Sequence, residues 1–187
     1  VIMTKSTHKS GTERVIEAVL NLECISVVNV QGDEPFINPS IIEDLFCSLE
    51  KKNVLMASAM ERINNKKDLI SPNSVKVTVD KNQDALFFSR SVIPFVRDGL
   101  ETVLDDNEKI KNQYNFYKHI GVYGYKKSFL CSYSEMNKST LEELEKLEQL
   151  RVLENGIKIR MIKTKFNSIG IDTVDDYEKA LKLINND

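Results

Sequence analysis

Hydrophobic residues along this chain alternate between runs typical of buried strands and spacings typical of helices. An apolar, β-branched run over residues 25–30 predicts a buried strand, and its composition is typical of a parallel strand covered on both faces. Apolar stripes at helical spacing precede and follow it, over residues 11–22 and 39–50. Ser10 has the position of a hydroxyl N-cap, and Pro39 suits the first turn of the second helix. This alternation of strand and helix predicts an α/β fold.

The second half of the chain continues the alternation. Residues 75–79 and 85–88 alternate with period two around a turn, which predicts a hairpin inserted in the sheet. Residues 98–117 are polar and charged without a clear period, and we expect an excursion there that is helical in part. A leucine stripe over residues 140–155 predicts one helix, and residues 157–164 alternate as a further strand.

The strand over residues 119–125 combines this alternation with polar and aromatic side chains. A period of two places His119 and Tyr123 on one face and Ile120 and Val122 on the other. The first face could line a polar pocket, or it could be a half-buried face whose hydrogen bonds are satisfied within the protein.

Composition limits the class of protein. With 187 residues, 41% of them hydrophobic and 29% charged, the chain suits one soluble domain with a substantial core, or two small ones. A net charge of -2 gives no reason to expect nucleic acid or an anionic membrane as partner. Three scattered cysteines fit free thiols in a reducing cytoplasm better than a disulfide framework. No apolar run is long enough to span a bilayer.

Two acids occupy positions suited to metal chemistry. The strand ending at Val30 stops at Gly32, so Asp33 follows its carboxyl end, where ligands bind in open α/β sheets. Asp172 precedes the last predicted helix, and two carboxylates from distant positions could share a divalent cation with substrate phosphates. The residues alone leave alternatives open, since Asp33 could belong to a solvated turn and Asp172 could simply favour a helix N-terminus.

Other candidate residues are equally ambiguous when taken singly. The segment from Ser10 to Arg14 could bind a phosphate or a nucleotide, or it could be only a capping box. Arg90 could hold a carboxylate bidentately or form an ordinary surface ion pair. Glu148 and Gln149 lie among other acids, a composition typical of a solvated helix face.

Several short segments, taken together and in order, resemble one family. They are HKSGTER (8–14), VNVQGDEP (28–35), PNSVKV (72–77), FSRSVIP (88–94), HIGVYGY (119–125), LEQLRVL (147–153) and GIDT (170–173). The chain resembles the 3-deoxy-manno-octulosonate cytidylyltransferases, which make CMP-Kdo for lipopolysaccharide. A Rossmann-type dehydrogenase is disfavoured, because the chain has no glycine-rich dinucleotide fingerprint.

The resemblance implies a three-layer α/β/α nucleotidyltransferase fold with a mixed, mostly parallel sheet, a cytoplasmic location and a homodimer. It implies transfer of CMP from CTP to 3-deoxy-D-manno-octulosonate (Kdo), with Mg2+ as cofactor and pyrophosphate as the second product. Carried over by position, Asp33 and Asp172 would be catalytic and bind the metal. Ser10, Gly11, Thr12 and Arg14 would lie by the cytidine. The residues implied around the sugar acid are Gln31, Arg90, His119, Tyr123, Glu148 and Gln149.

The resemblance also implies a difference at the N-terminus. The family opens with a strand and a glycine-containing loop, whose arginine and lysine grip the triphosphate, and this sequence starts after them. We therefore expect a single cytidylyltransferase domain over residues 1–187 that is N-terminally incomplete, and an isolated chain with little or no activity; near-normal turnover would contradict this. The alternatives are a cytidylyltransferase for sialic acid or amino-Kdo, and an inactive truncated fragment.

Overall fold

A mixed β-sheet of six strands forms the centre of the computed structural model, which describes residues 1–8, 10–97, 99–165, 170–171, 177–178 and 180–182. Its strands are β1 (Ser26–Val30), β2 (Met56–Arg62), β3 (Lys76–Val79), β4 (Ala85–Ser89), β5 (Tyr117–Lys126) and β6 (Ile159–Thr164). The described helices are α1 (Gly11–Val19), α2 (Pro39–Glu50), α3 (Lys66–Ile70), α4 (Leu100–Leu104), α5 (Asn107–Asn112), α6 (Lys127–Tyr133), α7 (Thr140–Glu145) and α8 (Gln149–Glu154). The α/β class and the hairpin, β3 with β4, are confirmed.

Strand direction agrees with the prediction for the sheet as a whole but not for the pairing of β1. Among the described strands, β2 and β6 are parallel, whereas β1, β2 and β3 all run antiparallel to the long strand β5. The sheet is therefore mixed as predicted, and β1, β2, β3 and β6 run in the same direction. The predicted parallel pairing is wrong for β1 and its described neighbour, because β1 is antiparallel to β5. The reason is that β-branched composition reports burial, while the direction of a neighbour depends on a distant segment of the chain.

Strand β5 organises the sheet. One edge of β5 pairs with β2 along nearly its whole length. The other edge is shared, because β1 covers residues 122–126 and β3 covers residues 117–118. The sheet is thus split along this edge, and the strand segment around His119 and Gly121 lies at the gap between β1 and β3.

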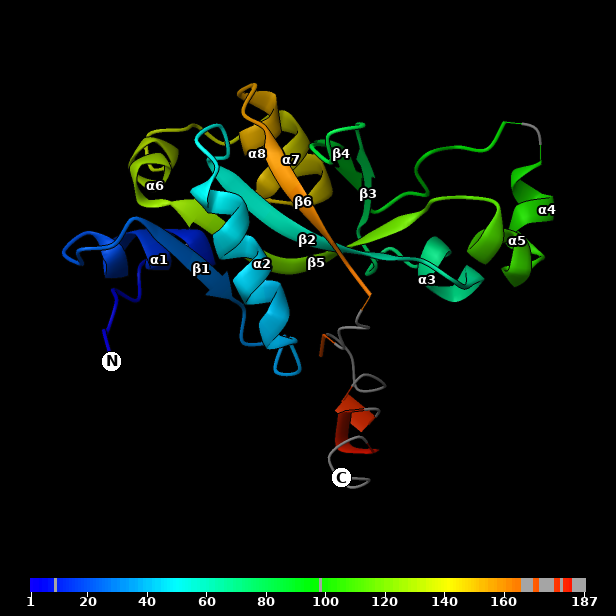
Figure 1. Cartoon of the computed structure of the whole chain (residues 1–187), viewed down its shortest axis with the longest axis horizontal. Coiled ribbons are helices and arrows are strands. Elements are labelled where there is room, and N and C mark those ends of the chain that lie inside the picture. Colours follow the sequence, from blue (N-terminus) through cyan, green and yellow to red (C-terminus); the bar gives the residue numbers. More distant parts are fainter. Residues whose placement is uncertain (9, 98, 166–169, 172–176, 179, 183–187) are drawn as a thin grey trace.

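Helices cover both faces of the sheet (Figure 1), as a three-layer architecture requires. On one face, Leu45 and Leu49 of α2 pack against Ile120 and Val122 of β5. On the other face, α1, α6 and α8 pack against the side of β5 that carries Tyr123. The predicted division of β5 into two faces is confirmed. Within the described part of the chain, no helix has the length and apolar character needed to cross a membrane.

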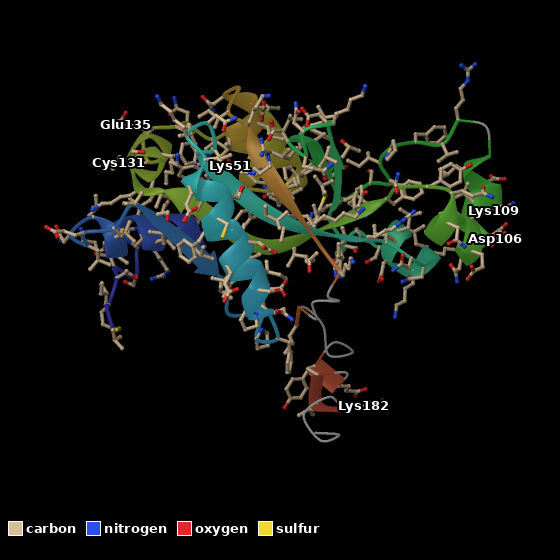
Figure 2. All side chains as sticks on the ribbon, viewed as in Figure 1. Lys51, Asp106, Lys109, Cys131, Glu135 and Lys182 are labelled. Carbon is tan, nitrogen blue, oxygen red and sulfur yellow. The ribbon has the colours of Figure 1, made fainter. Side chains whose placement is uncertain are left out.

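The polar segment after residue 98 folds beside the sheet with its own small core. Figure 1 shows α3, α4 and α5 together at the end of the molecule away from α6. Leu69, Val103, Ile110 and Phe116 are buried between them, which confirms that the excursion is helical in part. Asp106, which caps α5, and Lys109, which lies on it, are labelled in Figure 2.

The predicted single helix over residues 140–155 is two short helices. Ser139 and Glu142 form a capping box at the start of α7, whereas the spacing of Thr140 and Glu143 predicts one a residue later. Lys146 then adopts a left-handed conformation (φ 55°), which ends α7 before α8 begins. Leu144, which belongs to the leucine stripe that predicted this helix, is 75% exposed. The break turns the next residues, Glu148 and Gln149, inward instead of leaving them on a solvated helix face.

Candidate active site

A cavity of about 1290 Å³ opens where β1 and β3 leave β5 uncovered. Its wall includes the turn after β1, the segment of β5 around His119 that neither β1 nor β3 covers, the loop before β3, and the start of α8. A sheet edge where two strands diverge is the usual position of a ligand crevice in α/β proteins. The topology therefore creates this cavity at the same residues that the sequence motifs single out.

All but two of the predicted site residues line this cavity: Gly11, Thr12, Arg14, Gln31, Asp33, Arg90, His119, Tyr123, Glu148 and Gln149. Ser10 instead caps α1 by accepting a hydrogen bond from the Glu13 backbone N–H at 3.2 Å, and it borders a smaller cavity of about 640 Å³. Asp172 lies outside the described residues.

The turn after β1 presents Asp33 to the cavity. Its backbone carbonyl accepts a hydrogen bond from Ile171 N–H at 2.8 Å, so the main chain fixes the turn and the exposed side chain remains available. Beside it, a Cβ added at Gly121 would lie 3.8 Å from the Gln31 amide nitrogen, so Gln31 packs over this glycine. Glu34 lines the same wall. An exposed carboxylate at such a turn can combine with phosphate oxygens around a hard cation.

Arg90 faces the cavity but is partly held by the protein. Its Nε donates to the Glu145 carbonyl at 2.8 Å, and its Nη1 donates to the Pro72 carbonyl at 2.9 Å. The Glu145 carboxylate in turn accepts hydrogen bonds from the Ser89 hydroxyl and the Arg90 backbone N–H, at 2.6 and 3.0 Å. Nη2 makes no hydrogen bond to any described residue. The guanidinium is therefore pre-oriented, and its free side can meet an anionic ligand.

Lys76 is a buried cation behind this wall. Its side chain is fully buried, and Nζ donates to the carbonyls of Ser71 and Ser74 at 2.7 and 2.5 Å. Burial, reinforced by the nearby charge of Arg90 and opposed by Glu145, lowers the pKa of Lys76 to about 8. Lys76 and Arg90 together bind three carbonyls, those of Ser71, Pro72 and Ser74, in the loop that lines the cavity before β3.

Replacing Lys76 with methionine should destabilise the protein by about 2–4 kcal/mol at pH 7, because a buried carbonyl and a partly buried one lose their donor. The lowered pKa also predicts a pH dependence. Between pH 8 and the ordinary lysine value of 10.5, the unfolded chain holds more of this proton than the folded chain, so the contribution of Lys76 to stability rises with pH. The free energy of unfolding, measured with urea at pH 7, 8, 9 and 10, should rise with pH in the wild type and not in K76M. The same pH dependence in both proteins would contradict this prediction.

His119, Tyr123 and Gln149 form a buried polar group at the cavity wall. Burial, and secondarily Lys118, lower the pKa of His119 to about 3, so its ring is neutral at physiological pH. Burial also raises the pKa of Tyr123, whose hydroxyl donates to the Gln149 side-chain oxygen at 3.2 Å. Gln149 is 3% exposed, and its side-chain nitrogen has no hydrogen-bond partner among the described residues. A buried amide donor without a protein partner is costly and indicates a ligand acceptor.

The nucleotide side predicted from the sequence lies on α1. Thr12 donates its hydroxyl to the Glu148 carboxylate at 2.9 Å, which joins the first turn of α1 to the start of α8. Arg14 donates to the Thr4 hydroxyl and the Lys5 carbonyl at 3.0 and 3.2 Å and so holds the preceding loop. The start of α1 is therefore anchored to both the N-terminal loop and the opposite wall of the cavity.

Comparison with known proteins identifies the family. The sequence model described as "Cytidylyltransferase" matches residues 1–159. The chain belongs to the cytidylyltransferase family. A 3-deoxy-manno-octulosonate cytidylyltransferase of Geobacter metallireducens is 43% identical over 97% of this chain and 72% of its own length. The corresponding protein of Thermodesulfovibrio yellowstonii is 45% identical over 98% of this chain and 73% of its own length. The resemblance seen in the sequence motifs is thus confirmed.

Solved structures agree with this membership. A CMP:2-keto-3-deoxy-manno-octonic acid synthetase in complex with CTP superposes on this cytidylyltransferase with a TM-score of 0.86 at 34% identity, covering 99% of this chain and 72% of its own. An inositol-1-phosphate CTP transferase from T. maritima superposes with a TM-score of 0.61 at 16% identity, over 99% of this chain and 65% of its own, which shows the shared fold alone. The predicted nucleotidyltransferase fold is confirmed.

Three residues with evident structural roles at this site were missed by sequence reasoning. They are Ser58, which contacts His119; Lys76, which binds the loop before β3; and Glu145, which orients Arg90. The only signal for Lys76 was a lysine inside a strand of otherwise apolar and β-branched residues. No pattern in the sequence pointed to Ser58 or Glu145, since the role of each depends on contacts with distant segments.

Proposed function

We propose that this protein transfers CMP from CTP to Kdo, giving CMP-Kdo and pyrophosphate for lipopolysaccharide biosynthesis. The observation that carries the proposal is the convergence of the family's motif residues on one cavity. Residues from α1, the turn after β1, β5 and α8 meet there, although they are widely separated in sequence. Membership in the cytidylyltransferase family supports the same reaction.

We assign Gly11, Thr12 and Arg14 to the cytidine side of the cavity, with Ser10 acting through the α1 cap. We assign Gln31, Arg90, His119, Tyr123, Glu148 and Gln149 to the sugar acid. The free side of Arg90 suits the carboxylate of Kdo, because that edge of the guanidinium has no hydrogen bond to a described residue. The unpartnered amide nitrogen of Gln149 suits a hydroxyl or carboxylate oxygen of the same ligand.

The donor set fits Mg2+ in part. Asp33 supplies an exposed carboxylate at the cavity, although the described residues contain no group of three His, Cys, Asp or Glu side chains that could hold a metal by themselves. This is the pattern of Mg2+ sites that use one or two carboxylates together with substrate phosphates. Asp33 would hold the ion, with Asp172 as the second ligand proposed from the sequence. When bound, the ion would neutralise phosphate charge and favour ionisation of the attacking hydroxyl.

The chemical step follows from this placement. The anomeric hydroxyl oxygen of Kdo attacks the α-phosphorus of CTP, the bond from that phosphorus to the bridging oxygen breaks, and pyrophosphate leaves with the bond's electron pair. The hydroxyl proton is released to solvent, because His119, with its pKa lowered to about 3, is a weak base. The protein's contribution is positioning: Arg90 and Gln149 fix the sugar acid while the α1 residues fix the nucleotide.

The proposed reaction uses cytosolic substrates, and we place the protein in the cytoplasm as a homodimer. All three cysteines are free thiols, compatible with a reducing compartment, and Cys131 lies at the surface of α6 (Figure 2). Sedimentation velocity measurements of the protein's mass in solution test whether it is a dimer.

The reaction is tested with protein expressed from its own gene, supplied with CTP, Mg2+ and one sugar acid at a time. We expect CMP-Kdo and equimolar pyrophosphate with Kdo. Turnover with sialic acid or amino-Kdo, and none with Kdo, would show that the protein is a cytidylyltransferase for a different sugar acid. Absence of pyrophosphate with every acid would reject the proposed activity.

A further inference from the structure

A bulge in β5 brings a buried serine of β2 onto His119. In the pairing of β2 with β5, Ser58 is opposite Tyr123 while the next residue, Ala59, is opposite Ile120. Gly121 and Val122 are therefore extra residues on β5, and such bulges re-aim neighbouring side chains. The Ser58 hydroxyl fills this irregularity, 2.8 Å from the Val122 carbonyl, 3.4 Å from the Ile120 carbonyl and 2.8 Å from Nε2 of His119.

The contacts of Ser58 determine where the His119 proton lies. A serine hydroxyl carries one proton, and carbonyl oxygens only accept hydrogen bonds. The Ser58 hydroxyl must donate its proton to the Val122 carbonyl, because the two oxygens lie 2.8 Å apart and would repel each other without a hydrogen between them. The serine oxygen then accepts from Nε2 of His119, so that nitrogen bears the hydrogen. The Nδ1 lone pair is left as an acceptor.

The remaining contacts leave Nδ1 for a ligand. The imidazole ring packs edge-on against Phe88, with ring centroids 5.1 Å apart, and lies against Tyr123 at 5.3 Å. These contacts fix the plane of a side chain that is 8% exposed and lines the cavity. Nδ1 makes no hydrogen bond to a described residue. These contacts fix the orientation and the tautomer of the ring, and they leave Nδ1 without a hydrogen-bond partner among the described residues.

We propose that Ser58 is a positioning residue that fixes His119 as the Nε2–H tautomer, so that Nδ1 accepts a hydrogen bond from a hydroxyl group of the bound sugar acid. The ligand part of this proposal rests on the proposed function, whereas the tautomer part does not. Ser58 acts through His119 and has no direct contact with the reacting atoms. Its removal should therefore affect binding of the sugar acid far more than turnover.

The tautomer is measured directly by ¹⁵N NMR of histidine-labelled protein between pH 6 and 8. We expect neutral His119 with hydrogen on Nε2, and a shift of the Nδ1 resonance when Kdo is added. A wild-type spectrum with hydrogen on Nδ1 would overturn the proposal without bearing on the activity. If the enzyme made no CMP-Kdo, the proposed function would fail, and the same spectrum would still test the role of Ser58.

Kinetics with paired variants test the ligand contact. Ser58→Ala should give mixed tautomers and raise the KM for Kdo about five- to tenfold, with kcat and the KM for CTP within about twofold. Ser58→Thr keeps the hydroxyl and should restore both the tautomer and KM, and it remains informative if the alanine variant folds poorly. Ser48→Ala removes another buried hydroxyl, on α2, and should change neither. An unchanged KM for Kdo in folded Ser58→Ala would overturn the proposal.

His119 itself distinguishes the two nitrogens. An asparagine places a polar atom near the position of Nδ1, whereas a glutamine reaches the position of Nε2. His119→Asn should therefore retain more Kdo affinity than His119→Gln, because only asparagine can replace the proposed ligand contact. The reverse order would show that the substrate uses the Nε2 side.

Discussion

Replacing Asp33 with asparagine should lower kcat for CMP transfer by about 10²–10³-fold and raise the Mg2+ concentration needed for half-maximal rate. Asparagine keeps the shape of the side chain and its tolerance for turns but removes the negative charge. The backbone bond from Ile171 to the Asp33 carbonyl is unaffected, and the Asp33 side chain is exposed, so the fold should survive. Steady-state rates over a Mg2+ titration measure the effect.

Asp44→Asn is the matched control for this experiment. Asp44 is also an exposed aspartate, on α2, and it does not line the cavity. Its replacement makes the same chemical change and should leave kcat and the Mg2+ requirement within about twofold. If Asp33→Asn kept a rate within about threefold of the wild type, Asp33 would not be a metal ligand in the reaction.

The sequence predicted the parts of this fold that depend on local patterns. The capping role of Ser10, the start of α2 at Pro39 and the two faces of β5 follow from spacing within one segment, and the structure has all three. The motif residues also identified most of the cavity wall. Their convergence could be inferred only through the family resemblance, since no single residue distinguished a site from a turn or a cap.

What the sequence left undetermined depends on contacts between distant segments. The antiparallel direction of β1 is set by its partner β5, and the paired residues Ser26 and Lys126 are one hundred positions apart. The break at Lys146 interrupts a strong helical pattern at a residue type that rarely takes positive φ. Ser58 reaches His119 only through the bulge of β5, and no local spacing encodes a bulge.

The buried ion pair between Arg151 and Glu142 joins the two helices across that break. Arg151 donates through Nε and Nη2 to the two carboxylate oxygens of Glu142, at 2.7 and 2.5 Å, and both side chains are over 90% buried. Burial raises the pKa of Glu142, but the Arg151 hydrogen bond and charge outweigh it, and the net shift is downward. The guanidinium also lies 5.1 Å above the Tyr133 ring.

Replacing Arg151 with methionine should destabilise the protein by about 3–5 kcal/mol at pH 7, because a buried carboxylate would remain without its cation. The sign of the pH dependence follows from Glu142. Its lowered folded pKa means that the pair stabilises above the unfolded value of 4.5, and that this stability is lost as pH falls through the folded value. The difference in free energy of unfolding between wild type and R151M, measured with urea, should therefore narrow as pH falls below 4.5.

A second substitution separates the loss of the pair from the burial of an unpaired charge. Glu142→Gln combined with Arg151→Met removes both charges and should recover part of the stability lost in R151M. Lys158→Met breaks an ion pair with Asp84 in which the lysine side chain is 70% exposed, and it should cost less than about 1 kcal/mol.

Because the pair of Arg151 and Glu142 holds the helix that presents Gln149, R151M should also raise the KM for Kdo, measured well below the melting temperature of the variant. A stable R151M with unchanged KM would show that α8 keeps its position without the pair.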